Sequence, residues 1–281
     1  MEIIKEEHKL TPEEKWEQAT LANNFIFYKV MRNHQDACKQ LLEMLLGIKI
    51  ESMEMKQEET IALDYDSKGI RLDVFVKDTG RMFDVELQVA NTKELPERAR
   101  YYQGVMDVDT LKAGQKYKEL RDSHIIFICL EDVFKNGLPV NTFANICLED
   151  GKTKFGDRTY KHFFFAPLCA KMIEDKEVKA FFEFLISNQA SSSYTDELKD
   201  YVADAKRSTE NKMQFMTWER QRAYDLDAGR EEGIEIGAQQ KAVEDAENFL
   251  RENISEEIIA KCTGLPLEKV LELKEKVSVK A

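Results

Sequence analysis

Residues 69–90 show the clearest alternation of apolar and polar positions in the chain. A period of two between apolar side chains is typical of β-strands with one buried face. Gly80 lies between the two alternating runs, at a position where a tight turn requires a positive φ. We therefore predict a β-hairpin over residues 69–90, whose apolar positions are Ile70, Leu72, Val74 and Val76, then Phe83, Val85, Leu87 and Val89.

The turn also predicts the pairing of the two strands, because a two-residue and a four-residue loop at 78–81 give the same register. In that register all the apolar residues lie on one side, whereas a slip of one residue would expose half of them. The expected apolar pairs are Val76 with Phe83, Val74 with Val85, and Leu72 with Leu87. On the polar side the expected pairs are Asp73 with Glu86 and Arg71 with Gln88.

The pairing of Asp73 with Glu86 has two interpretations. Two carboxylates about 5 Å apart across a strand pair repel each other, and a divalent cation between them would reverse that interaction. Hard cations such as Mg²⁺ are often held by one or two carboxylates, with positions left for water and a phosphate. The alternative is a solvated polar face, which is common in antiparallel sheets.

The elements around the hairpin predict a mixed α/β domain. Pro12 in a first turn and Gly47 at an end bound a helical region over 11–47. The apolar run at 123–130 is typical of a strand covered on both faces. The other expected elements are a strand at 48–56, a connection at 57–68, a helix from Pro96 to Gly114, a hairpin of 143–148 with 159–165 across 149–152, and a helix at 171–188.

A shift in composition at 189–194, QASSSY, predicts a linker and a domain boundary. We therefore expect a domain at 1–189, a helical linker or oligomerisation segment at 190–240, and a small module at 241–281. Within the second segment, glycines 229, 233 and 237 repeat every four residues, which permits close helix approach and a homo-oligomer. The last segment has the pattern of a helix, a short break and a second helix.

Composition narrows the function classes. The chain has 281 residues, five cysteines and four histidines, and neither residue type shows the spacing of a zinc site or of a nucleophilic Ser-His or Cys-His pair. No signal-peptide pattern and no run of about 18 apolar residues is present, so we expect a cytoplasmic protein that does not enter a membrane. The net charge of −12 counts against broad attraction to nucleic acid and restricts any DNA contact to a local surface.

Asp73 followed by Glu86-Leu87-Gln88 resembles the core of the PD-(D/E)XK nuclease superfamily, in the form found in the Rpn family of recombination-promoting nucleases and putative transposases. In that family the final lysine is commonly replaced by glutamine. Four blocks occur in family order over about residues 20–190: LANNFIFYKVM at 21–31, RLDVFVKDTGRMFDVELQV at 71–89, PERARYY at 96–102 and LKAGQKY at 111–117.

This resemblance implies a restriction-endonuclease-like core, with a mixed central sheet flanked by helices and an α-helical C-terminal extension. It also implies a DNA endonuclease that depends on Mg²⁺ or Mn²⁺. Asp73, Glu86 and the carbonyl of Leu87 would bind the metal, with Asp73, Glu86 and Gln88 as the catalytic residues. Because Gln88 is uncharged, Arg98 or Lys77 would contact the nucleic acid. Arg98 has a second interpretation, as a structural ion-pair partner of Glu86.

Some positions depart from the family pattern. Asn24 stands where the family usually has an acid, Tyr28 stands where it has a lysine, and Leu72 replaces the proline of the motif. These departures favour an alternative function, a catalytically inactive nuclease-like module that binds DNA or protein. A transposase that performs strand transfer is a third possibility. The C-terminal pair of helices resembles a small helix-turn-helix, and its mixed charge favours protein interaction or autoregulation over sequence-specific DNA binding.

Overall fold

The computed structural model describes residues 10–55, 60–61, 70–71, 74–89 and 93–280. They form two compact units, Met1–Phe215 and Met216–Ala281. In the first unit the strands are β1 (Glu54–Met55), β2 (Thr60–Ile61), β3 (Ile70–Arg71), β4 (Val74–Asp78), β5 (Arg81–Gln88), β6 (Asp122–Cys129), β7 (Val140–Phe143) and β8 (Thr159–Phe165). Its helices are α1 (Pro12–Gln18), α2 (Asn24–Asn33), α3 (Gln35–Leu46), α4 (Leu95–Thr110), a 3₁₀ turn (Tyr117–Glu119), α5 (Ala166–Met172), α6 (Lys176–Ser187), α7 (Ser193–Arg207) and the start of α8 (Thr209–Arg251).

Six strands form one mixed sheet in the order β1-β4-β5-β6-β8-β7. β4 and β5 are the antiparallel arms of the predicted hairpin, while β5, β6 and β8 run parallel to one another. The pairs Val74–Val85 and Val76–Phe83 confirm the predicted register, and residues 79–80 make a two-residue turn in which Gly80 has φ +79°. The alternation and the turn therefore determined the local structure correctly.

The first part of the predicted hairpin differs from the expectation. Among the described residues, the ladder between β4 and β5 runs from Val74–Val85 to Asp78–Arg81. Arg71 pairs with Thr60 in a separate two-stranded sheet, so the expected pairing of Arg71 with Gln88 is wrong. Residues 72–73 lie outside the described part of the chain, which leaves the pairs Leu72–Leu87 and Asp73–Glu86 as predictions.

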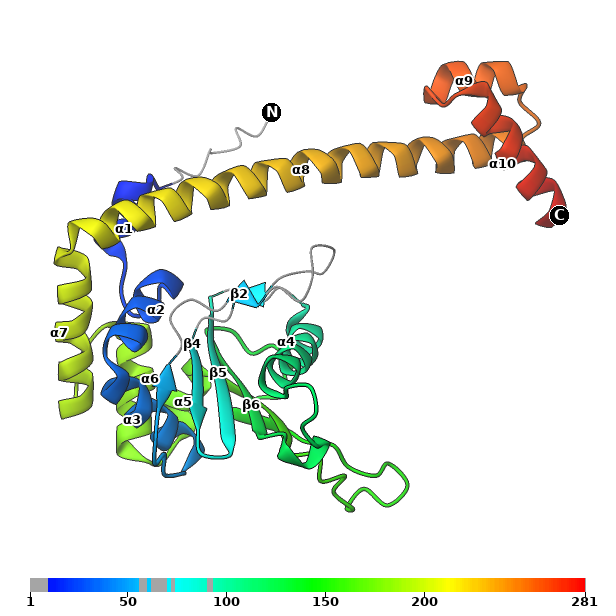
Figure 1. The fold of residues 1–281 in the computed structure, drawn as a ribbon. Coiled ribbons are helices and arrows are strands. Elements are labelled where there is room, and N and C mark those ends of the chain that lie inside the picture. Colours follow the sequence, from blue (N-terminus) through cyan, green and yellow to red (C-terminus); the bar gives the residue numbers. More distant parts are fainter. Residues whose placement is uncertain (1–9, 56–59, 62–69, 72–73, 90–92, 281) are drawn as a thin grey trace. The chain divides into compact units, whose positions relative to one another are not determined.

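Helices cover both faces of the sheet (Figure 1). On one face α4 packs against apolar residues of β4, β5, β6 and β8, and Leu95 and Met106 of α4 are fully buried there. On the other face α2 contacts β4 and β5, and Phe182 of α6 stacks on Phe164 of β8. This arrangement is the expected mixed sheet flanked by helices. Among the described helices, none is long and apolar enough to cross a lipid bilayer.

The hairpin expected between 143–148 and 159–165 is displaced. β8 pairs instead with β7, from Val140–Phe164 to Phe143–Lys161. The expected turn at 149–152 does form, because Asp150 accepts hydrogen bonds from the amides of Lys152 and Thr153. It closes a small separate hairpin with one bridge, Ile146–Lys154, and the apolar residues of this hairpin are largely exposed. Alternation in the sequence does not show whether such a segment joins the main sheet.

The expected boundary at residue 189 does not coincide with the division into compact units, which falls after Phe215. Ser192 caps α7, and α7 packs against α2 and α6. The Tyr194 side chain is buried and its hydroxyl donates a 2.8 Å hydrogen bond to the carbonyl of Ala37. Phe215 packs against Trp16 with ring centroids 5.2 Å apart. The polar stretch at 189–194 thus lies within the first unit, with 189–192 as a short loop and 193–194 as the start of α7.

The second unit consists of the remainder of α8 together with α9 (Glu256–Thr263) and α10 (Leu267–Lys280). α8 continues unbroken through glycines 229, 233 and 237. α9 ends at Gly264, which has φ +75°, and Lys274 of α10 forms an ion pair with Glu256. The expected pattern of helix, break and helix is present. Its small core contains Ala246, Leu250, Ile259, Val270 and Leu273.

Candidate active site

β5 carries the polar residues of the candidate site. Asp84, Glu86 and Gln88 alternate with Val85 and Leu87 and lie on the face of the sheet that α4 covers. β5 is paired with β4 on one side and with β6 on the other, so its backbone is held in the middle of the sheet. A strand in this position presents every second side chain to the same layer of helix.

The polar side chains on this face are buried. Asp84 is fully buried, Glu86 is 2% exposed and Gln88 is 9% exposed. The alternative of a solvated polar face is therefore wrong for these residues, because α4 excludes water from that side. Charged groups are rarely buried unless a cation or hydrogen-bond donors compensate them.

Arg98 of α4 provides such compensation. Its Nη2 lies 2.9 Å from Glu86 Oε2 and its Nη1 donates a 2.9 Å hydrogen bond to Gln88 Oε1. One planar guanidinium thus binds both side chains at the same time, as the fork geometry of arginine permits. Of the two interpretations of Arg98, the structure shows the ion pair with Glu86.

Tyr102, one helical turn after Arg98, completes the network. Its hydroxyl accepts hydrogen bonds from Nη2 and Nε of Arg98 at 3.1 and 3.3 Å, and the guanidinium lies 5.3 Å from the Tyr102 ring centre. The Phe127 ring of β6 lies 5.7 Å from the same guanidinium. Burial, then the negative charge of Glu86, raises the pKa of Tyr102. The phenol therefore stays neutral and acts as a hydrogen-bonding group.

Lys77 lies at the other end of the hairpin. It is paired with Met82, four residues before Glu86 in β5, which corresponds to about 13 Å along the strand. Its Nζ forms a 3.1 Å ion pair with Asp109 near the end of α4. The structure therefore does not bring Lys77 together with Glu86, Gln88 and Arg98, and its contact with nucleic acid stays a prediction.

The remaining candidates are only partly described. Asp73 lies outside the described residues. The side chain of Leu87 points to the opposite, apolar face, while its carbonyl accepts a 3.3 Å hydrogen bond from Nε2 of Gln88. Asn24 is the first residue of α2, and the Tyr28 hydroxyl accepts a hydrogen bond from Arg32 on the same helix.

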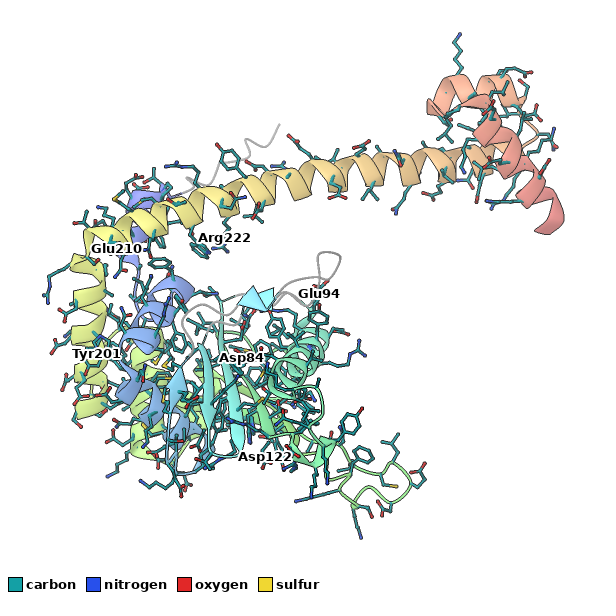
Figure 2. The ribbon with its side chains drawn as sticks, in the orientation of Figure 1. Asp84, Glu94, Asp122, Tyr201, Glu210 and Arg222 are labelled. Carbon is teal, nitrogen blue, oxygen red and sulfur yellow. The ribbon has the colours of Figure 1, made fainter. Side chains whose placement is uncertain are left out.

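Asp84 is a candidate that reasoning from the sequence did not single out. It lies two residues before Glu86 on the same face, and both of its carboxylate oxygens are buried. Its charge contributes to the raised pKa of Tyr102. Figure 2 shows Asp84 in the sheet, with Glu94 at the start of α4. Alternation indicated that Asp84 shares a face with Glu86, and only the position of α4 shows that this face is buried.

The donor atoms at this site fit a hard divalent cation. The described candidates are the carboxylate of Glu86, the carbonyl of Leu87 and the amide oxygen of Gln88, and oxygen donors of this kind suit Mg²⁺ or Mn²⁺. Within the described ranges, no group of three or more His, Cys, Asp or Glu residues is arranged to hold a metal ion. Asp73, the other expected ligand, lies outside these ranges, and its part in the site stays a prediction.

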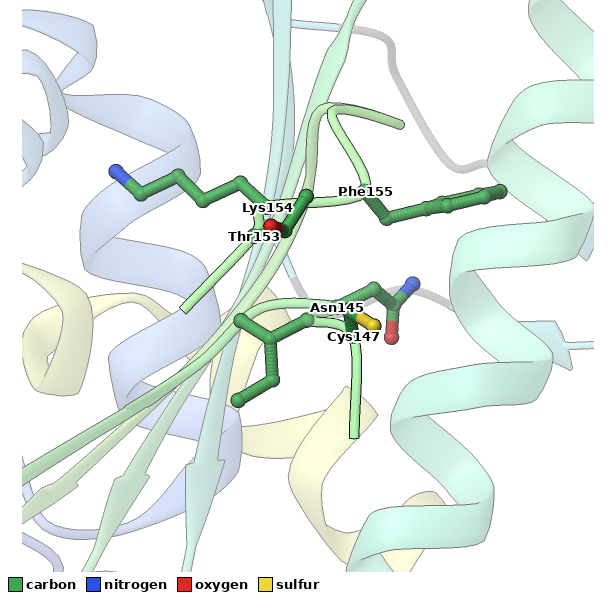
Figure 3. Close-up of a pocket in the computed structure, with 6 residues that line it drawn as sticks. Asn145, Cys147, Thr153, Lys154 and Phe155 are labelled. Carbon is green, nitrogen blue, oxygen red and sulfur yellow. The ribbon is translucent and has the colours of Figure 1, made fainter. Parts of the chain in front are cut away.

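A surface pocket of about 510 Å³ lies apart from this site, in the small hairpin between β7 and β8 (Figure 3). This hairpin leads into the first residue of β8, which pairs with Ser123 near the start of β6. Glu86 pairs with Phe127, four residues further along β6. The pocket is therefore at the opposite end of the sheet from Glu86. It is lined by Asn145, Ile146, Cys147, Thr153, Lys154 and Phe155.

The comparison with known families covers most of the chain. The family described as PD-(D/E)XK nuclease family transposase matches residues 23–252, from the residue that caps α2 to the end of α8. No curated protein and no solved structure matches the chain significantly. The matched region contains the whole central sheet, the Glu86-Leu87-Gln88 segment and α4. The chain belongs to the PD-(D/E)XK nuclease family transposases.

Proposed function

We propose that this protein is a DNA endonuclease of the Rpn type that requires Mg²⁺ or Mn²⁺ and acts in the cytoplasm. The observation that carries the proposal is the buried grouping of Glu86, Gln88 and Arg98 on one face of the sheet, in a chain that belongs to a nuclease family. Asp73, Glu86 and the carbonyl of Leu87 would hold the metal.

Each residue has a role in phosphodiester hydrolysis. A bound divalent cation lowers the pKa of a water molecule and stabilises negative charge on the scissile phosphate. Gln88 would orient the attacking water or the phosphate through its amide. Arg98 would supply the positive charge that Gln88 lacks, since a guanidinium binds phosphate oxygens in pairs.

Nicking of supercoiled plasmid in the presence of Mg²⁺ or Mn²⁺ tests this function. We expect Asp73→Ala and Glu86→Gln each to lower the nicking rate at least about a hundredfold, because each removes a charged metal ligand. Asp122→Asn is the matched control. It removes an acid at the start of β6, at the other end of the sheet, and should leave nicking unchanged (Figure 2). An Asp73→Ala or Glu86→Gln protein that nicks at the wild-type rate would contradict the proposed site.

The same assay addresses the alternative of an inactive binding module. That alternative is favoured by the ion pair that already satisfies Glu86 and by the net charge of −12. It predicts no nicking by the wild-type protein with either metal, together with retained binding to DNA or to a protein. Strand transfer predicts joined ends as well as cut ones, and cleavage without joining would exclude it.

A further inference from the structure

Three of the oxygen atoms proposed for this site, Oε2 of Glu86, Oε1 of Gln88 and the carbonyl of Leu87, accept hydrogen bonds within the protein. Arg98 occupies Oε2 of Glu86 and Oε1 of Gln88, each at 2.9 Å. The amide of Gln88 donates to the carbonyl of Leu87. A divalent cation that approaches Oε2 of Glu86 or Oε1 of Gln88 therefore meets the guanidinium of Arg98, which already contacts both atoms.

We infer that Arg98 is the exchangeable counter-ion of this site, which holds Glu86 and Gln88 until a divalent cation replaces it and is then free to contact a DNA phosphate. The inference rests on the proposed function, because it assigns the order of events at the same site. Arg98 is in this sense a positioning residue before metal binding and a phosphate contact after it.

The exchange follows from charge. The Glu86 side chain is 3% exposed, and breaking a buried ion pair without replacement is strongly unfavourable. A divalent cation satisfies the same carboxylate with twice the charge. Two cations at one carboxylate repel each other, so binding of the metal and retention of Arg98 oppose one another.

Tyr102 provides a place for Arg98 after the exchange. Its hydroxyl accepts from Nε and Nη2, and its ring and that of Phe127 both lie within 6 Å of the guanidinium. Contacts between a guanidinium and aromatic rings do not depend on Glu86. The Arg98 side chain is also 27% exposed. It can therefore release Glu86 while its stem and its aromatic contacts remain.

Calorimetric titration of the full-length protein with Mn²⁺, in the absence of DNA, measures the competition. We expect Arg98→Met to bind Mn²⁺ at least about tenfold more tightly than the wild type, because the competing cation is gone. The matched control is Arg81→Met. It removes an ion pair of the same kind, with Asp78 at 2.9 Å, at the turn of the hairpin, and it should not change Mn²⁺ affinity.

A second measurement uses the wild-type protein and covers the case in which Arg98→Met fails to fold. The nuclear magnetic resonance signal of the Arg98 Nε–H, assigned with Arg98→Lys, is followed during titration with Mg²⁺. Exchange predicts a shift that saturates at the same metal concentration as a calorimetric titration with Mg²⁺. A guanidinium that only supports the fold would keep its contacts, and its signal would not move.

The variant Glu86→Gln distinguishes failure of the proposed metal site from failure of the counter-ion inference alone. If the wild type binds Mn²⁺ and Glu86→Gln abolishes this binding, the metal site of the proposed function stands. Unchanged or weaker affinity in Arg98→Met, or an unmoved Arg98 signal, then overturns the counter-ion inference alone. If the wild type binds neither metal, both the metal site and the inference fail.

Discussion

Leu198 offers a direct test of whether α7 belongs to the first compact unit, Met1–Phe215, called the nuclease unit below. Its side chain is fully buried in α7, which packs against α2 and α6. Residues 190–240 were expected from the sequence to form a linker or an oligomerisation segment, and a residue of such a segment would contribute little to the stability of the first domain. The substitution Leu198→Ala separates these two arrangements.

The size of the effect follows from the burial. Truncation of a fully buried leucine to alanine typically costs 2–5 kcal/mol, since it removes apolar contacts and leaves a cavity. A loss of about 3 kcal/mol in a unit of this size lowers Tm by roughly 6–12 °C. Tyr194→Phe should lower the free energy of unfolding less than Leu198→Ala does, by about 1 kcal/mol, because it removes only the hydrogen bond to Ala37.

Calorimetric melting of the full-length variants gives the result. Leu226→Ala is the matched control, because it makes the same chemical change at a residue of α8 that is 65% exposed. We expect its effect to stay within about 0.5 kcal/mol. Equal shifts for Leu198→Ala and Leu226→Ala would refute the assignment of α7 to the nuclease unit.

Two further predictions concern the sheet and its surroundings. Burial lowers the pKa of both His124 and His162 to about 4, so folding favours the neutral imidazoles. Stability should fall as the pH drops from about 6.5 toward 4, by about 2 kcal/mol for each histidine at pH 5, and urea unfolding should show a smaller loss in His162→Gln. Gly80→Ala should lower the free energy of unfolding by about 1 kcal/mol, because the turn needs φ +79°. Gly104→Ala, in an exposed part of α4, should raise it by about the same amount, because alanine favours a helix over glycine. A destabilised Gly104→Ala or an unaffected Gly80→Ala in thermal melts would contradict these assignments.

Local patterns predicted much of the fold. The period of two in residues 74–88 and the glycine at position 80 determine the hairpin and its register, because both act between neighbouring residues. The alternation also placed Glu86 and Gln88 on one face. The order of helices and strands predicted the mixed sheet, and the helix end at Gly47 lies where the sequence indicated.

The errors arose where distant segments compete for the same partner. Whether Val140–Phe143 or residues 143–148 pair with β8 depends on which segment reaches the sheet edge, and both have strand-like composition. Arg71 likewise pairs with Thr60, which no local pattern indicates. The domain boundary expected at 189 stays a prediction: the stretch 189–194 has the composition of a linker, while several residues of the helix that follows are buried against α2 and α6.

The sequence by itself determined which polar residues of the hairpin share a strand face. Only the tertiary structure decided what that face contacts. α4 converts Asp84, Glu86 and Gln88 from surface residues into buried ones, and its Arg98 lies against Glu86. The physical reason is that side-chain direction follows from the backbone period, whereas burial and ion pairing depend on segments that approach from elsewhere in the chain.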